Sequence, residues 1–373
     1  MTKIGILGGG IIGLSSAYYL NRQGHDVTII DQSNLVDGCS HGNAGMIVPS
    51  HFVPLAAPGM IAKGIRWMFD SSSPFFIKPR FDRELIKWGY HFYKSATAEH
   101  VKKSAPALKE ISLLSKSLYQ QWKRDLPFDF GYQEKGLLML FQTKEAQEEE
   151  RETVSMAASY KIEAHLLSSS EVQRLEPNVQ IDARGAVYFP GDAHLVPQTL
   201  LKGLIDFLKS NGVKFVDQTS ILDFQIDANK VKEIHTSNGI FFFDEVVMAL
   251  GSWSGIVAKK LNLKLPMQAG KGYSFLLDDV ANNISIPSIL LEARVAVTPM
   301  GSSLRFGGTM EINGVDHSIN MNRVKGIVKS IPQYYPEMKI EIPEKDKIWH
   351  GLRPCSPDGL PYVGRSKELK NLV

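Results

Sequence analysis

Cysteine is scarce in this sequence. Only Cys39 and Cys355 occur among 373 residues, and neither lies in a C-x-x-C pair. Two thiols cannot form the disulfide framework of small secreted domains, so the composition fits a reducing compartment. Runs of one charge sign are also missing, and the formal net charge is only +3. We therefore expect no nucleic-acid-binding surface.

Long apolar runs are missing as well. The longest stretch without Asp, Glu, Lys or Arg covers 38–62, and Pro49, Pro54, Pro58 and two histidines interrupt it. Such a stretch is not a membrane-spanning helix. No signal peptide is predicted, because an apolar strand begins at residue 3 and cleavage would destroy it. These observations predict a cytoplasmic protein.

What the sequence does contain is a glycine motif between two short apolar runs. Segment 3–31 reads KIGILGGGIIGLSSAYYLNRQGHDVTIID. It predicts a strand at 4–7, a helix that ends at Gly24, and a second strand at 27–30. Because two strands flank the helix, the segment is typical of a βαβ unit.

The glycines of this unit have the spacing G-x-G-x-x-G, at Gly8, Gly10 and Gly13. The first permits a tight turn, the second lets the backbone approach a pyrophosphate, and the third lets helix and strand pack closely. The helix N-terminus receives the phosphates, and Asp31 is placed to accept hydrogen bonds from ribose hydroxyls. The motif predicts a dinucleotide site and leaves FAD and NAD open.

Small residues dominate the segment after the second strand, GCSHGNAGMI at 38–47. We expect it to contact the bound ligand, because a dinucleotide would extend in that direction; a mobile loop is the alternative. Segment 52–80 has apolar residues near one helical face and basic residues beside them. It predicts a lid or domain-packing segment, with a helix in a membrane interface as the second interpretation.

The rest of the chain predicts two further sets of elements. Helices are expected at 82–121, parted near Pro106, and at 144–160, 197–210 and 323–330. Strands at 213–216, 221–226, 231–236 and 240–243 predict an antiparallel meander, and 245–251 predicts a buried parallel strand. A separate strand is expected at 136–141. Strands at 272–277, 295–299 and 304–309 suggest a larger antiparallel sheet. Segment 349–365, dense in Gly and Pro, predicts a loop.

Several blocks together resemble one family. They are GGGIIG (8–13) with Asp31, SHGNAGMIVPSHFVPLAAPG (40–59) with KGIRWMF (63–69), Ala-Leu-Gly ending at Gly251, GKGYS (270–274) and GLRPCSPDGLPYVG (351–364). With them the chain resembles the FAD-dependent D-amino-acid oxidase superfamily, and within it the bacterial D-amino-acid dehydrogenase small subunits. Family members usually continue past the GLRP block to another strand and a glycine-containing helix start. The sequence stops at Val373, so we expect a fragment or a flavin site completed in another way.

The resemblance implies an α/β fold, with an FAD-binding Rossmann-type (βαβ) domain and an antiparallel-sheet α+β substrate domain. The expected boundaries are 1–85, 163–263 and 348–373 for the first domain, and 86–162 and 264–347 for the second. The cofactor implied is FAD. We expect it to be non-covalent, because Cys355 does not lie at the offset that covalent relatives use. No metal site is expected.

The resemblance also assigns cofactor contacts. They are Gly8, Gly10, Ile11, Ile12, Gly13, Asp31 and Gln32 on the ADP side, Ser40, His41, Gly42, Asn43, Ala44 and Gly45 by the pyrophosphate and isoalloxazine edge, Ile221 by the adenine, and Ala249 and Gly251 beside FAD.

Arg353 is the main substrate-binding candidate, because a guanidinium can grip a carboxylate with two parallel hydrogen bonds. A domain-interface salt bridge is the alternative. Tyr273 is a second candidate, with a packing role as its alternative. His51 is a third, with a structural hydrogen bond as the favoured alternative. No catalytic side chain is assigned, because the sequence offers no obvious His/Asp pair.

The expected reaction is oxidative deamination of a D-amino acid to a 2-oxo acid and ammonia, with electrons passed to a respiratory quinone or another acceptor. A quinone acceptor would place the protein at the inner face of the cell membrane. The alternatives are a glycine- or sarcosine-type oxidase that uses oxygen, and a dinucleotide-binding protein without turnover. The oligomeric state stays open.

Overall fold

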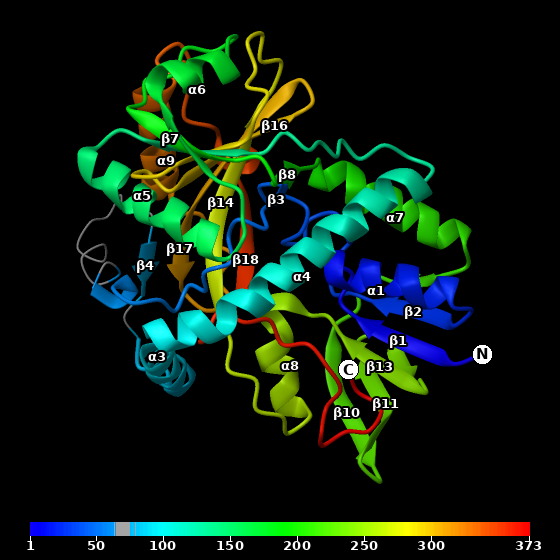
Figure 1. The fold of residues 1–373 in the computed structure, drawn as a ribbon. Helices are drawn as coiled ribbons and strands as arrows, with labels where there is room; N and C mark the ends of the chain where they lie inside the picture. The colour runs from blue at the N-terminus through cyan, green and yellow to red at the C-terminus, as the bar shows by residue number, and fades with distance from the viewer. Residues whose placement is uncertain (63, 65–74, 79) are drawn as a thin grey trace.

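The computed structural model describes residues 1–62, 64, 75–78 and 80–373 (Figure 1). Residues 63, 65–74 and 79 of segment 52–80, predicted as a lid or domain-packing segment with a membrane-interface helix as the alternative, lie outside these residues. Within the described chain no helix is both long enough and apolar enough to span a membrane.

A parallel sheet carries the glycine motif. Its strand order is β13-β1-β2-β9, and every pair is parallel. The strands are β1 (Lys3–Leu7), β2 (Asp26–Ile30), β9 (Lys214–Val216) and β13 (Glu245–Met248). Residues from α1 (Ile11–Arg22) and α7 (Pro197–Ser210) share one apolar cluster with the inner strands. The expected Rossmann-type unit is thus confirmed.

An antiparallel sheet packs against the other side of these strands, in the order β10-β11-β12. Its strands are β10 (Ile221–Asp227), β11 (Lys230–Thr236) and β12 (Gly239–Phe241). The predicted meander was wrong for its first member, because β9 pairs in parallel with β2 instead. At the C-terminal end, Leu372 forms a parallel bridge with Val246 of β13.

A large mixed sheet forms the second part of the molecule. Its order is β18-β14-β17-β16-β15-β5-β7-β6, and β4 pairs with β17. The strands are β4 (Phe75–Ile77), β5 (Leu137–Phe141), β6 (His165–Ser168), β7 (Gly185–Phe189), β14 (Gln268–Leu277), β15 (Ser288–Leu290), β16 (Val295–Met300), β17 (Ser303–Ile312) and β18 (Trp349–Cys355). The β15–β5 and β17–β4 pairs are parallel, so the sheet is mixed.

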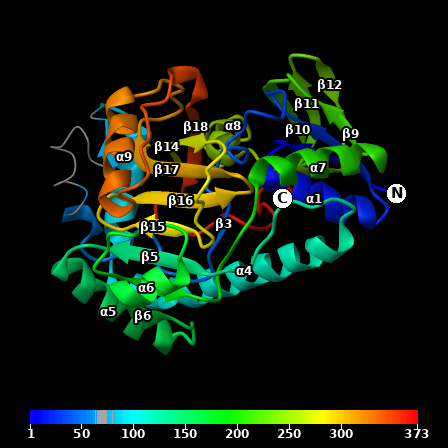
Figure 2. The same ribbon diagram turned by 90° about the horizontal axis from the view of Figure 1, so that it is seen from above.

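Helices cover this sheet and connect it to the Rossmann-type unit. α9 (Met321–Tyr334) and α6 (Ser169–Leu175) share one apolar cluster with the sheet, while α5 (Lys144–Ser159) belongs to another. α4 (Ala98–Asp125) runs past both parts (Figure 2). The remaining elements are α3 (Arg83–Ser95), α8 (Ser254–Lys260), η1 (Gly251–Trp253) and η2 (Lys345–Lys347).

Two predicted elements differ in the structure. The break in segment 82–121 falls at 96–97, where Thr97 caps α4 by accepting a hydrogen bond from the His100 N–H, and Pro106 lies inside the helix. Residues 349–355 form strand β18 instead of a loop, and among the described strands β18 pairs only with β14. A strand at the edge of a sheet tolerates proline, because one side of its backbone needs no hydrogen-bond partner. The Pro-containing segment can therefore form β18.

The predicted domain boundaries remain a prediction. β6, β7 and β18, assigned from the sequence to the cofactor domain, pair within the large sheet. A short antiparallel ribbon, β3 (Met46–Ile47) with β8 (Ala193–His194), lies between the two parts. The residues of β3 line the large cavity.

Candidate active site

The glycine turn leaves no space for side chains. Gly8 has φ +105°, and a Cβ there would lie 2.4 Å from the carbonyl oxygen of Ala249. A Cβ on Gly13 would lie 1.9 Å from the carbonyl oxygen of Gly8. The N-cap of α1, Gly10, has no side-chain cap. Glycine therefore brings the strand, the helix start and the 249–251 turn into contact, as a phosphate-binding turn requires.

Asp31 is fixed beside this turn. Its Oδ2 accepts a hydrogen bond of 2.6 Å from the Gly9 N–H, and its Oδ1 accepts from the Ser33 N–H and hydroxyl at 2.7 and 2.8 Å. A small cavity of about 20 Å³ opens here. Gly10, Asp31, Ser40 and His41 are the predicted cofactor residues among its lining.

The 40–45 loop is held by its own polar groups. The Ser40 Oγ accepts from the Ile11 N–H at 3.0 Å, which joins the loop to the start of α1. Asn43 donates to the Ser40 carbonyl at 2.7 Å and accepts from the Gly45 N–H at 2.6 Å. These contacts hold the predicted loop against the helix N-terminus.

Gly42 ties the same loop to the large sheet. Its carbonyl accepts a 2.7 Å hydrogen bond from the Ser274 hydroxyl of β14. A Cβ at position 42 would lie 2.1 Å from the indole ring of Trp349 in β18. Sequence reasoning named Gly42 but missed Ser274 and Trp349 as its partners, because their contacts depend on how β14 and β18 pair.

A cavity of about 730 Å³ lies between α1, α4, α7, this loop and strands β14, β17 and β18. Its size is within the range of ligand-binding pockets. The predicted residues that line it are Ile11, Ile12, Ser40, Gly42, Asn43, Ala44, Gly45, His51, Tyr273 and Arg353. The structure thus brings the C-terminal arginine and the N-terminal loop to one cavity.

Arg353 reaches this cavity from β18 and remains exposed. Its Nη1 donates to the carbonyl oxygen of Thr309 at 3.1 Å. Among the ion pairs of the described residues none involves Arg353, so the salt-bridge alternative finds no support there. A cationic group without a carboxylate partner, facing a large cavity, is suited to bind an anionic group of a ligand.

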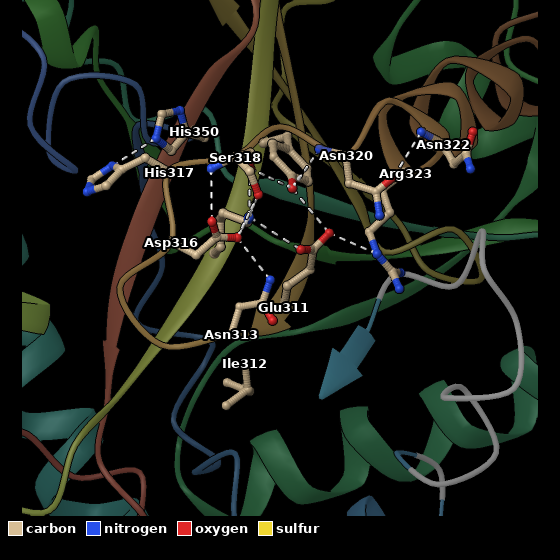
Figure 3. A network of polar contacts seen from close by, with 12 residues as sticks. Glu311, Ile312, Asn313, Asp316, His317, Ser318, Asn320, Asn322, Arg323 and His350 are labelled. Atoms are coloured by element: carbon tan, nitrogen blue, oxygen red, sulfur yellow. Dashed lines mark hydrogen bonds and ion pairs between the residues drawn. The ribbon is translucent and has the colours of Figure 1, made fainter. Parts of the chain in front are cut away.

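Tyr273 touches the cavity, but its hydroxyl does not point to Arg353. It donates to Glu311 Oε1 at 3.2 Å and accepts from the Asn320 N–H at 3.1 Å, and the side chain is 1% exposed. Glu311 Oε1 also forms an ion pair of 2.9 Å with Arg323 Nε (Figure 3). The structure therefore places this hydroxyl in a buried polar network, which corresponds to the packing alternative.

Lys271 belongs to the same network and is fully buried. Its Nζ lies 2.5 Å from Asp316 Oδ2 and 3.6 Å from Glu311 Oε2. Burial alone would raise the pKa of Asp316, but the hydrogen bonds from Lys271 and Ser318 hold this pKa well below its usual range. The network anchors the loop after β17 to the underside of β14.

His51 lines the cavity, and its Nδ1 lies 3.0 Å from the Ser50 hydroxyl oxygen. The imidazole is surrounded by protein atoms except where it borders the cavity. This burial, with Arg294 nearby, lowers the pKa of His51 to about 4. The Ser50 hydroxyl in turn contacts Asp192 Oδ2 at 2.5 Å. Sequence reasoning missed this His–Ser–Asp connection, because Ser50 and Asp192 are 142 positions apart.

Of the remaining predicted cofactor contacts, some lie near the glycine turn and others lie away from both cavities. Ala249 follows β13 directly and approaches Gly8, and Gly251 lies two residues further along the same turn. Gln32 is exposed, and Ile221 packs in an apolar cluster with Ile30. Neither is among the described residues lining the two cavities. Their roles remain predictions.

Burial disfavours the thiolate form of both cysteines. Burial raises the pKa of Cys39, whose sulfur accepts from the Leu352 N–H at 3.1 Å. Burial also raises the pKa of Cys355. A thiol of raised pKa is a poor nucleophile, so neither side chain is activated for covalent attachment.

Sequence comparison finds relatives along the whole chain. A family model described as "DAO: FAD dependent oxidoreductase" matches residues 3–373. A D-amino acid dehydrogenase of Neisseria meningitidis is 30% identical over 377 residues, covering 98% of this chain and 88% of that protein. One of Helicobacter pylori is 29% identical over 375 residues, covering 100% and 88%.

Structural comparison finds the same fold in solved structures. Glycine oxidase from Bacillus cereus matches with a TM-score of 0.74 at 23% identity, over 100% of this chain and 88% of that one. Reduced L-alpha-glycerophosphate oxidase from Mycoplasma pneumoniae, with FAD bound, matches with a TM-score of 0.73 at 17% identity, over 100% and 88%. At these sequence identities the comparison shows a shared fold only.

Proposed function

This chain belongs to the DAO family of FAD-dependent oxidoreductases, and from that membership we propose that it oxidises the carbon–nitrogen bond of a D-amino acid. The products are a 2-oxo acid and ammonia, and the electrons pass to a respiratory quinone or another acceptor. The names of its relatives, D-amino acid dehydrogenases at 28–30% identity, support this substrate class.

The cofactor is FAD, and the residues present fit it. Gly8 and Gly13 form a turn with no space for a Cβ, and Gly10, the N-cap of α1, has no side chain over the helix N-terminus. Asp31 is fixed beside the turn, and the large cavity begins at the 40–45 loop. When bound, FAD supplies the acceptor for the electrons removed from the substrate. Because neither thiol is activated, we propose that FAD is held without a covalent bond.

The single observation that carries the substrate proposal is Arg353. Its exposed guanidinium lines the same cavity as the 40–45 loop, and Thr309 holds one of its nitrogens. A carboxylate bound in two parallel hydrogen bonds to Arg353 would fix the neighbouring carbon in one orientation. Such positioning removes much of the entropic cost of the reaction.

Apolar side chains complete the cavity. Ile11, Met46, Ile111 and Leu200 contribute to its lining from α1, β3, α4 and α7. They limit water around the bound amine, which strengthens the interaction between the carboxylate and Arg353. The chain therefore combines one cationic group for the carboxylate with an apolar enclosure for the rest of a small amino acid.

An anaerobic reduction assay tests the proposal. The purified flavoprotein is titrated with D-alanine, D-proline, their L-enantiomers and N-methylglycine while the FAD absorbance near 450 nm is followed. We expect the D-amino acids to bleach the flavin. Bleaching by the L-enantiomers or by N-methylglycine alone, or by none of the compounds, would overturn it. Peroxide measured during aerobic turnover, against reduction of a soluble quinone, identifies the acceptor.

A further inference from the structure

The cavity histidine is connected to a buried carboxylate through one hydroxyl. The β3–β8 ribbon pairs Met46 with His194 and Ile47 with Ala193, so the residues just beyond these strands meet. Ser50 follows β3 and Asp192 precedes β8. The Ser50 Oγ lies 2.5 Å from Asp192 Oδ2, and the Ser50 N–H donates to Asp192 Oδ1 at 3.1 Å.

The direction of these hydrogen bonds sets the tautomer of His51. An ionised carboxylate only accepts hydrogen bonds, so the single hydroxyl proton of Ser50 is donated to Asp192. The Ser50 oxygen must then accept from the His51 Nδ1, which lies 3.0 Å away. With its proton on Nδ1, the imidazole leaves Nε2 unprotonated. Nε2 therefore carries a free lone pair in a residue that lines the cavity.

The direction of these hydrogen bonds argues against a nucleophilic serine and against a purely structural role for the three residues. A nucleophilic serine needs its proton to be taken by the histidine. Here the Ser50 proton points to Asp192, and Ser50 is 8% exposed. A merely structural tie between β3 and β8 is already made by the Ser50 N–H. The ordered hydroxyl adds a path for protons between the cavity and a side chain that is 1% exposed.

Charged neighbours favour the proton at the far end of this path. Burial first, and then the charge of Arg294 between β15 and β16, lowers the pKa of His51 to about 4, and Arg294 also acts on Glu150 of α5. Burial raises the pKa of Asp192 to about 6, although Ser50 and Lys116 of α4 act in the opposite direction. A proton arriving from the cavity is therefore held more strongly by Asp192 than by His51.

We infer that His51, Ser50 and Asp192 form a proton relay that takes a proton from the ammonium group of the bound substrate. One N–H bond of the ammonium breaks as the His51 Nε2–H bond forms. The Nδ1 proton passes to the Ser50 oxygen, and the Ser50 hydroxyl proton passes to Asp192 Oδ2. The amine keeps its electron pair and becomes neutral, as the oxidation of its carbon requires. This inference rests on the proposed function.

Two substitutions interrupt the relay in different ways. Ser50→Ala removes the hydroxyl. Asp192→Asn keeps the shape but presents an NH₂ group to Ser50, so the hydroxyl turns to donate to His51 Nδ1 and the histidine proton moves to Nε2. Ser50→Thr retains a hydroxyl and serves as the conservative control. His165→Gln, in an exposed 2.9 Å pair with Glu163, controls for loss of a histidine elsewhere.

The first measurement is the pH dependence of anaerobic flavin reduction by a D-amino acid in stopped flow. We expect Ser50→Ala and Asp192→Asn to move the midpoint of the rate upward by about one pH unit, a tenfold change in proton affinity. At high pH, where the free amine is already neutral, their rates should stay within about threefold of the wild-type rate. Both control variants should keep the wild-type profile. FAD content and melting temperature identify any variant that fails to fold.

The second measurement reports on His51 without turnover. Nitrogen-15 NMR of histidine-labelled holoenzyme, assigned with His51→Gln, should find the Nδ1–H tautomer in the wild type and the Nε2–H tautomer in Asp192→Asn. Flavin reduction with unchanged pH profiles in both interrupting variants overturns the relay and leaves the proposed function standing. Failure of every amino acid to reduce the wild-type flavin overturns the proposed function, and the relay with it.

Discussion

The carbonyl oxygen of Thr309 accepts a 3.1 Å hydrogen bond from Nη1 of Arg353. Thr309 has φ +67°, a conformation that β-branched residues rarely adopt. It lies where the pairing of β14 and β17 is interrupted between Lys271 and Tyr273. This bulge turns a main-chain carbonyl toward the cavity strand β18, so a strained residue orients the cation proposed to bind substrate.

Removing the Arg353 guanidinium should weaken substrate binding and leave the cofactor in place. A charge-assisted bidentate contact contributes roughly 2–4 kcal/mol, so Arg353→Ala should raise KM by about 30- to 1000-fold. FAD content should stay near the wild-type value. Steady-state kinetics with a D-amino acid measures the first quantity and the absorbance ratio at 450 and 280 nm the second. Arg365→Ala, in an exposed pair with Glu245, is the matched control. A variant that loses FAD to the same extent as it loses substrate affinity would count against substrate binding by Arg353.

The strain at Thr309 should appear in unfolding experiments. A residue with a Cβ costs about 1–2 kcal/mol more than glycine in the left-handed region. We therefore expect Thr309→Gly to have a free energy of unfolding about 1 kcal/mol higher than Thr309→Ala, the reverse of the usual order in strands. Urea denaturation of the two variants measures the difference. A more stable alanine variant would show that position 309 is not held at positive φ in solution.

Asp316 should contribute to stability at neutral pH and lose that contribution in acid. Its pKa is depressed in the folded protein, so the contribution is present above the unfolded pKa of about 4 and is lost as the pH falls toward the folded value. At pH 7, Asp316→Asn should lower the free energy of unfolding by about 2 kcal/mol, because buried Lys271 loses its nearest anion. Between pH 5 and 3 the wild type should lose more stability than the variant. Parallel slopes would disprove this role of Asp316.

Gly42 should be intolerant of even a methyl group. A Cβ there would overlap the Trp349 indole at 2.1 Å, so Gly42→Ala must displace the loop that we propose lies beside FAD. We expect FAD to bind at least tenfold more weakly, measured by fluorescence titration of the apoprotein. Gly191→Ala is the control, because a Cβ at position 191 meets nothing within 4 Å. Normal FAD affinity in Gly42→Ala would mean that the loop can shift without cost.

The flavin should leave the protein on denaturation. Neither thiol is activated, since burial raises the pKa of both Cys39 and Cys355. Precipitation with acid should release all FAD into the supernatant, and Cys355→Ser should retain the wild-type FAD content. Yellow colour that stays with the pellet would disprove non-covalent binding.

Local chemistry explains which features could be predicted from the sequence. The glycine turn and the helix of 197–210 depend on neighbours within a few dozen residues, and both occur as predicted. The ribose contact of Asp31 stays a prediction. Strand β18 did not look like a strand, because its formation depends on pairing with β14. Likewise, Pro106 is tolerated inside α4, while a capping threonine decides where that helix begins.

The site shows the same division. Arg353 and the 40–45 loop were predicted because their blocks carry a family pattern. The orientation of the Tyr273 hydroxyl was not predictable, since a bulge and the Glu311 network determine it. The Ser50–Asp192 contact was also beyond prediction, because the β3–β8 ribbon that creates it contains only two residues on each side.

Trp349 gives this protein a built-in optical probe. Its indole packs on Gly42 and lines the large cavity, and indole emission overlaps the near-ultraviolet absorption of flavins. Energy transfer from this tryptophan should therefore weaken as FAD leaves, so that its emission rises, and strengthen as FAD returns. The difference in emission between the wild type and Trp349→Phe would follow cofactor exchange in real time, in unlabelled protein and without any substrate.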